Sequence, residues 1–127
     1  MAYKDPEKQR EYHRNYMRRR YANNPDAYAA HKELTKVNRN KTRDRLRAWI
    51  SAYLDEHPCV DCGESDRIVL EFDHISNDKL ANVADMVGQA RPLQAVIAEV
   101  AKCQVRCANC HRRLTYQRAR ATIDSTR

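Results

Sequence analysis

The chain has 127 residues, of which 42% are hydrophobic and 32% are charged, and its formal net charge at pH 7 is +7. This length suits one small domain plus an extension, and with so few apolar residues we expect a metal or a partner to add stability. No apolar run reaches the roughly eighteen residues that a transmembrane helix needs, so we expect no membrane span. Residues 1–20 lack the apolar segment of a signal peptide, which predicts a cytoplasmic protein.

The positive charge is concentrated in the first part of the sequence. Residues 1–50 contain 14 Lys and Arg against 6 Asp and Glu, whereas the remainder is nearly neutral. This asymmetry indicates a polyanionic partner, most simply nucleic acid, although Lys and Arg on a solvated helix face also keep proteins soluble. We therefore predict that residues 1–41 form a basic, mostly helical arm that binds nucleic acid. Its expected phosphate contacts are Arg14, Arg18, Arg19 and Arg20.

Two helices are expected in the first half. Asp5-Pro6 reads as an N-cap followed by proline at the first helical position, which predicts a helix to about Tyr21. Asn23-Asn24-Pro25 interrupts it, and Asp26 is suited to cap the next helix. From residue 42 onward, apolar residues recur at helical spacing and predict one face that packs on the second half of the chain. They are Leu46, Trp49, Ile50, Tyr53 and Leu54.

Short strands and helices alternate in the second half, which makes the predicted fold class α+β. Residues 67–72 (RIVLEF) are rich in β-branched and apolar side chains, which predicts a strand. Residues 76–90 are expected to be irregular, whereas residues 93–100 place apolar side chains at helical spacing. A brief strand at 104–106 is expected to lead into a basic helix at 112–120.

Four of the five cysteines form two C-x2-C pairs, separated by residues 63–106. In a reducing compartment, thiols more often bind a metal than form disulfides. Zinc prefers tetrahedral thiolate coordination, and Gly63 suits the tight turn after the first pair; the alternative is two coincidental pairs of buried thiols. We predict one structural Zn2+ and a spare, buried Cys103. The predicted zinc ligands are Cys59, Cys62, Cys107 and Cys110.

His111 directly follows the last of these cysteines, and C-x-x-C-H is also the motif for covalent haem attachment. A haem would leave Cys59 and Cys62 unexplained and needs an apolar pocket that this chain can hardly build, so zinc is preferred. Four thiolates complete a tetrahedral zinc site, which leaves His111 for another role. Together with Asp73-His74 at the predicted strand end, His111 makes a plausible second site for Mg2+, Mn2+ or a similar ion.

These motifs together resemble the HNH, or ββα-metal, endonuclease family. CVDCG at 59–63, LEFDHI at 70–75 and KCQVRCANCHRRLT at 102–115 occur in the order of the family pattern, which covers about residues 59–118. The basic opening YKDPEKQREYHRNY is similar to the leaders of small phage-type members. The resemblance implies a small, treble-clef-like ββα-metal domain with a structural zinc over residues 42–127, preceded by the helical arm.

The resemblance also implies roles for individual residues. His74 matches the general base of the family, Asp73 its carboxylate metal ligand, and His111 its final metal-binding residue. The chain departs from the pattern at the middle asparagine, because Lys102-Cys103 occupies that region. The implied activity is metal-dependent hydrolysis of DNA phosphodiester bonds, in which a neutral histidine activates water and a divalent ion stabilises the scissile phosphate and the leaving 3′ oxygen.

The alternative is a non-catalytic, zinc-stabilised DNA-binding module. The distinguishing feature is the set Asp73, His74 and His111, which a binding module does not need. The target, nicking versus double-strand cutting, and the oligomeric state stay open. Further phosphate contacts are expected from Lys79, Arg106, Arg112, Arg113, Arg118 and Arg120.

Overall fold

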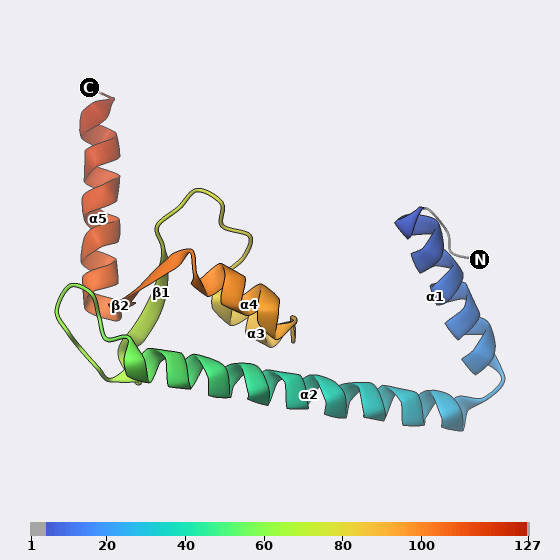
Figure 1. Cartoon of the computed structure of the whole chain (residues 1–127). Coiled ribbons are helices and arrows are strands. Elements are labelled where there is room, and N and C mark those ends of the chain that lie inside the picture. Colours follow the sequence, from blue (N-terminus) through green and yellow to red (C-terminus); the bar gives the residue numbers. More distant parts are fainter. Residues whose placement is uncertain (1–4, 127) are drawn as a thin grey trace. The chain divides into compact units, whose positions relative to one another are not determined.

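The protein is described here by a computed structural model of residues 5–126, and it is an α+β fold in which helices predominate (Figure 1). In chain order the elements are α1 (Pro6–Ala22), α2 (Pro25–Glu56), a 3-10 turn η1 (Arg67–Val69), β1 (Leu70–His74), α3 (Val83–Gly88), α4 (Leu93–Val100), β2 (Cys103–Cys107) and α5 (Ala108–Ser125). The chain divides into two compact units, and the boundary lies within α2, between Arg39 and Asn40. Within residues 5–126, no helix combines the length and apolar character required to cross a membrane.

The first unit contains α1 and the beginning of α2. As predicted, Asp5 caps α1, because its carboxylate accepts a hydrogen bond from the Glu7 backbone N–H at 2.9 Å. The predicted cap of the next helix is corrected: the Asn24 side chain accepts a hydrogen bond from the Ala27 N–H at 3.1 Å, and Asp26 lies inside the first turn. None of the α1 residues is buried, so this helix contributes surface and little core.

The second unit is built on the predicted apolar face of α2. Leu46 and Leu54 are buried, and the other three residues of that face pack around them. Leu46 joins a cluster with α3 and α4 that contains Val83, Met86, Val87, Val96 and Val100. Leu54 joins a second cluster that contains Cys59, Leu70, Val105, Cys107 and Cys110. These three cysteines are therefore part of the core, which ties their placement to the folding of α2, whereas Cys62 is exposed.

Four element predictions in the second half are confirmed, extended or corrected. The helix at 93–100 is confirmed, and the strand at 104–106 extends to Cys103–Cys107. The strand predicted at 67–72 is corrected, because the Asp66 side chain caps a 3-10 turn through the Ile68 N–H and the strand begins only at Leu70. The irregular segment predicted at 76–90 is corrected as well, since residues 83–88 form α3.

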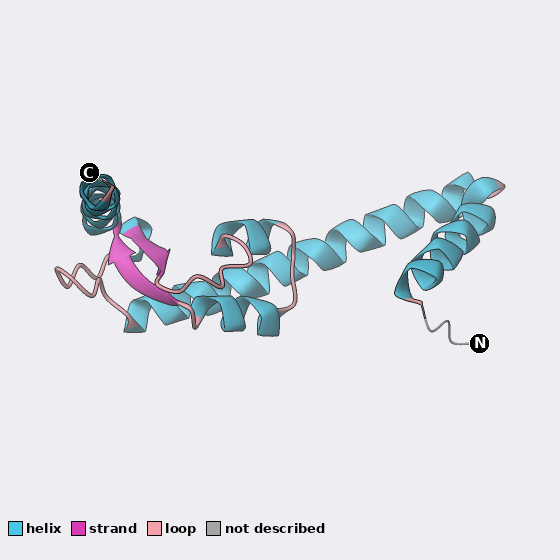
Figure 2. Ribbon diagram, turned by 90° about the horizontal axis from the view of Figure 1, so that it is seen from above, coloured by secondary structure: helices cyan, strands magenta, loops and turns pink. Residues whose placement is uncertain are grey.

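β1 and β2 form an antiparallel pair whose register runs from Leu70↔Cys107 to His74↔Cys103. Figure 2 shows the strands side by side, close to the first turns of α5. Side chains along a strand point alternately to opposite faces. Leu70 and Phe72 face the core clusters, so Glu71 and Asp73 face the other way. This alternation decides which polar residues can meet.

Candidate metal centre and polar network

The four cysteines predicted as ligands come together in the second unit. Their sulfur atoms all lie within 4.8 Å of one another, and the sulfurs of Cys62 and Cys107 are 3.7 Å apart. Four thiols grouped in this way are positioned to bind one metal ion. Within residues 5–126, no other cluster of three or more His, Cys, Asp or Glu side chains meets this criterion.

Two tight turns present these sulfurs. In the first turn, Gly63 adopts a φ of 77°, the left-handed region that favours glycine, and its N–H donates to the Cys59 carbonyl at 2.9 Å. In the second, Cys107 is the N-cap of α5, and its sulfur accepts a hydrogen bond from the Cys110 N–H at 3.4 Å. The start of α5 and the cysteine cluster are thus one local structure.

The thiols of the cluster differ in acidity. Burial raises the pKa of Cys59, but backbone N–H donors, first that of Cys107, outweigh burial and lower the pKa to about 6. The hydrogen bond with Cys107, together with burial, raises the pKa of Cys110 to about 12. Because neighbouring thiolates repel one another, a bound cation is what allows all four sulfurs to ionise together.

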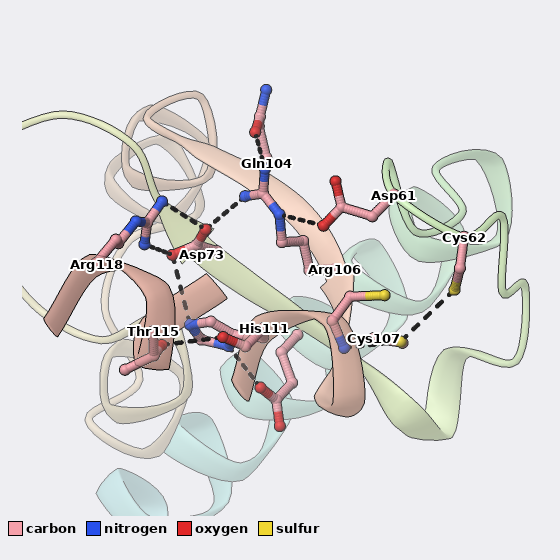
Figure 3. A network of polar contacts seen from close by, with 11 residues as sticks. Asp61, Cys62, Asp73, Gln104, Arg106, Cys107, His111, Thr115 and Arg118 are labelled. Atoms are coloured by element: carbon pink, nitrogen blue, oxygen red, sulfur yellow. Dashed lines mark hydrogen bonds and ion pairs between the residues drawn. The ribbon is translucent and has the colours of Figure 1, made fainter. Parts of the chain in front are cut away.

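Asp73 is the centre of a polar network between β1 and α5. It is 3% exposed, and it accepts hydrogen bonds from Arg118 at 3.0 and 3.2 Å and another from Arg106. Figure 3 shows its carboxylate among the side chains of Arg106, His111 and Arg118. Burial raises the pKa of Asp73, but the hydrogen bond and charge of Arg118, with smaller contributions from His111 and Arg106, lower it. Asp73 is therefore an ionised carboxylate at neutral pH.

His111 lies between two carboxylates. Its Nδ1 is 2.7 Å from Glu71 Oε2, and its Nε2 is 3.4 Å from Asp73 Oδ1. The ionised Glu71 carboxylate can only accept a hydrogen bond, so His111 donates to it from Nδ1. In a neutral His111, the lone pair is then on Nε2, which faces Asp73. Metal-binding histidines are held by this kind of contact to their second nitrogen. The sequence prediction missed Glu71, although its spacing from Asp73 on a strand placed both on one face.

His74 lies apart from Asp73 and His111. As the next residue of β1, it points to the opposite face, where its Nε2 is 2.8 Å from Glu99 Oε1. Glu99 is 1% exposed and was not predicted as a site residue. The structure thus brings Asp73 and His111 together and holds His74 on the other side of the strand.

Glu99 has two further partners besides His74. It accepts a hydrogen bond from the Leu80 N–H at 3.0 Å and pairs with Lys102 Nζ at 3.0 Å. Burial raises the pKa of Glu99, but the hydrogen bonds from Lys102, Leu80 and His74 lower it to about 2. Lys102 is only three residues from Glu99, but His74 and Leu80 are 25 and 19 residues away, so no local pattern identified the whole network.

Cys103 lies outside the metal cluster, as predicted. It is partly buried against the α3–α4 core, and its thiol donates to the Glu99 carbonyl at 3.4 Å. Burial, and then the charges of Glu99 and Asp73, raise its pKa to about 11. Such a thiol stays protonated at neutral pH and behaves as a small core side chain.

The predicted phosphate-binding residues fall into two groups. Arg106 is 8% exposed and also bonds to Asp61 at 2.8 Å and Gln104 at 2.7 Å, whereas the Arg118 side chain that reaches Asp73 is 47% exposed. The others are exposed: Arg14, Arg18, Arg19 and Arg20 on α1, Lys79 in the loop after β1, and Arg112, Arg113 and Arg120 on α5. The exposed cations are available to a polyanion, but Arg106 is committed to carboxylates.

Comparison with known proteins identifies no relative: the chain matches no family model, no curated protein and no solved structure.

Proposed function

We propose that this protein is a metal-dependent DNA endonuclease of the HNH type. One observation carries the proposal: the buried, ionised Asp73 lies 3.4 Å from Nε2 of a histidine that immediately follows the cysteine cluster. Ligand atoms at this separation can share one divalent ion, since Mg2+ binds oxygen ligands at about 2.1 Å. The contact from Glu71 that orients His111 supports a ligand role further.

We assign Zn2+ to the cysteine cluster. Four sulfur ligands and no oxygen ligand are typical of a structural zinc, which has no open position for substrate. The cluster joins the turn after α2 to the first turn of α5, so the ion would hold β1, β2 and α5 as a ββα unit. Zinc thiolates also require reduced cysteines, which fits the cytoplasm of a bacterium or of a phage-infected cell.

The proposed reaction is an in-line attack of water on a DNA phosphate. His74 accepts the proton of the water as the new P–O bond forms, the bond to the 3′ oxygen breaks, and that oxygen leaves and takes up a proton from solvent. Asp73 and His111 would hold the divalent ion, with Glu71 orienting the imidazole. When bound, such an ion stabilises the charge on the phosphate and on the leaving oxygen. Because His74 lies on the other face of β1, the substrate would have to cross the end of this strand.

The exposed cations provide the proposed DNA contacts. Arginines on α1 and α5 neutralise phosphates without reading bases, so they position the backbone rather than select a sequence. Arg118 has a long side chain that is half exposed, and it can exchange the Asp73 carboxylate for a phosphate.

The non-catalytic zinc-stabilised DNA-binding module is the second candidate, and one observation favours it. Asp73 already has two guanidinium partners, Arg106 and Arg118, which satisfy its charge without an ion. In that case Asp73 would be a structural residue that fixes α5 against β1.

Plasmid cleavage separates the two candidates. Zinc-loaded, full-length protein is incubated with supercoiled plasmid and Mg2+, Mn2+ or Ni2+, with EDTA as the metal-free control. We expect nicked or linear DNA from the wild type, and a rate at least about 100-fold lower for His74→Ala, which loses the base but keeps zinc and DNA binding. His57→Ala is the matched control, because this exposed imidazole contacts Tyr53 and lies outside the network. Unimpaired cleavage by His74→Ala would contradict the mechanism.

A further inference from the structure

Glu99 connects three segments of the second unit that are separate in sequence. Its Oε1 meets His74 Nε2 at the end of β1 and the Leu80 N–H in the following loop, and its Oε2 meets Lys102 just before β2. The side chain is 1% exposed. A buried carboxylate is costly unless it is paired and hydrogen-bonded, so these three contacts are what stabilise it there.

The contacts to Glu99 decide which nitrogen of His74 carries the proton. An ionised carboxylate has no hydrogen to donate, and Lys102 keeps Glu99 ionised. The 2.8 Å contact therefore requires His74 Nε2 to be the donor. In the neutral imidazole only one nitrogen carries hydrogen, so the lone pair is on Nδ1.

Nδ1 of His74 is the nitrogen that water can reach. The structure records no hydrogen bond to Nδ1 from residues 5–126, and none of the buried side-chain N or O atoms in this range lacks a partner. An unpartnered Nδ1 is therefore in contact with solvent, in agreement with the 11% exposure of the side chain. The imidazole thus has one nitrogen fixed in the interior and one directed outward.

We propose that Glu99 is the positioning residue of His74: it accepts the Nε2 hydrogen and so leaves the Nδ1 lone pair to take the proton of the attacking water. Glu99 touches neither DNA nor a reacting atom and acts through His74. Its bond to the Leu80 N–H also anchors the loop that follows β1 to the carboxylate that holds His74. This role rests on the proposed function, in which His74 is the base.

The test combines a spectroscopic readout with cleavage, both on zinc-loaded, full-length protein. Long-range proton–nitrogen NMR of 15N-histidine protein distinguishes the two neutral tautomers of His74. Three variants are compared: Glu99→Ala, Glu99→Gln and Val100→Ala. Glu99→Gln keeps the shape, but its amide can either accept from or donate to the imidazole. Val100→Ala is the matched control, because Val100 is 2% exposed in the same helix and belongs to the apolar core.

We expect wild-type His74 to be the Nε2–H tautomer, and both Glu99 variants to show a mixture. Cleavage by Glu99→Ala should be at least about 100-fold slower, which is the size of a general-base contribution, and its KM for DNA should be unchanged. Folded Val100→Ala protein should cleave like the wild type. If Glu99→Ala does not fold, the spectra of the wild type and of Glu99→Gln show whether Glu99 sets the tautomer of His74.

Two results would overturn the proposal: an Nδ1–H tautomer in the wild type, or equal tautomers and equal cleavage in Glu99→Ala and Val100→Ala. A wild-type protein that never cleaves DNA refutes the proposed function instead. In that case the NMR data still decide whether Glu99 positions His74.

Discussion

His111 Nε2 and Asp73 Oδ1 face each other across 3.4 Å, with β1 on one side and α5 on the other. The same carboxylate is bound by the Arg118 guanidinium at 3.0 and 3.2 Å. In the proposed function, a divalent ion held by Asp73 and His111 would therefore compete with the Arg118 guanidinium for one carboxylate. This competition is accessible to experiment because Arg118, unlike Arg106, is half exposed.

Arg118→Gln should raise the affinity for Mn2+. A hydrogen bond to a charged group contributes at least about 1.5 kcal/mol. Without the competing Arg118 guanidinium, Mn2+ should therefore bind roughly tenfold more tightly. Titration calorimetry of Mn2+ into the zinc-loaded protein measures this change. Arg120→Gln, an exposed residue on the same helix, should leave the affinity as it is. Equal Mn2+ affinity in both variants would mean that Arg118 and the ion do not compete.

Acid should weaken the fold partly through Glu99. Its pKa is about 2 in the folded protein, below the ordinary 4.5, so its contribution to stability is complete above about pH 4.5 and disappears as the pH falls towards 2. Denaturant unfolding of the wild type and of Glu99→Gln over this pH range gives the difference in their free energies of unfolding. This difference separates the contribution of Glu99 from that of Asp73, whose pKa is also lowered. At pH 7 the variant should be less stable by about 1–3 kcal/mol. A difference that does not shrink on acidification would contradict this assignment.

Cys59→Ser should lose the bound metal and unfold the second unit, whereas Cys103→Ser should keep both. Structural zinc contributes about 10–16 kcal/mol in small zinc peptides, as much as the whole stability of a typical domain. Elemental analysis gives the metal content, and circular dichroism gives the helix content. A folded Cys59→Ser protein without metal would show that the apolar clusters suffice on their own.

The arginines of α1 should set the salt dependence of DNA binding. In full-length protein carrying Arg18→Gln, Arg19→Gln and Arg20→Gln, the slope of log Kobs against log salt should fall by about 0.9 for each phosphate that is no longer neutralised. Arg67→Gln is the control, because Arg67 pairs with Asp55 at 3.2 Å in the second unit. An unaltered slope would assign α1 to a different partner.

The sequence correctly predicted the features that depend on residues close together in the chain. The Asp5 cap, the α2 apolar face and the C-x2-C pairs each depend on residues close in sequence, and the structure confirms them. α3 was missed because six residues are too few to establish a helical period. Residues 67–69 have the composition of a strand, but the Asp66 side chain bonds the backbone into a turn instead.

The partners of the candidate site residues were less predictable. Glu99 and His74 are 25 residues apart and meet only because α4 contacts β2, the strand that pairs with β1, so sequence spacing carries no signal for this pair. Alternation along β1 separates His74 from Asp73, although the sequence prediction grouped both residues with His111 at the strand end. The structure keeps the alternation through His74, since the ladder extends to the His74↔Cys103 pair.

The number of exchangeable Mn2+ ions per zinc-loaded chain tests the central claim most directly, because it asks whether Asp73 and His111 are ligands or only structural partners. Electron paramagnetic resonance during a Mn2+ titration counts bound ions independently of cleavage. We predict one bound Mn2+ in the wild type and in His74→Ala. Binding should be at least about tenfold weaker in His111→Ala, which loses a ligand but retains the cysteine cluster. No bound Mn2+ in the wild type, or the same affinity in His111→Ala, would contradict the account and favour a non-catalytic zinc module.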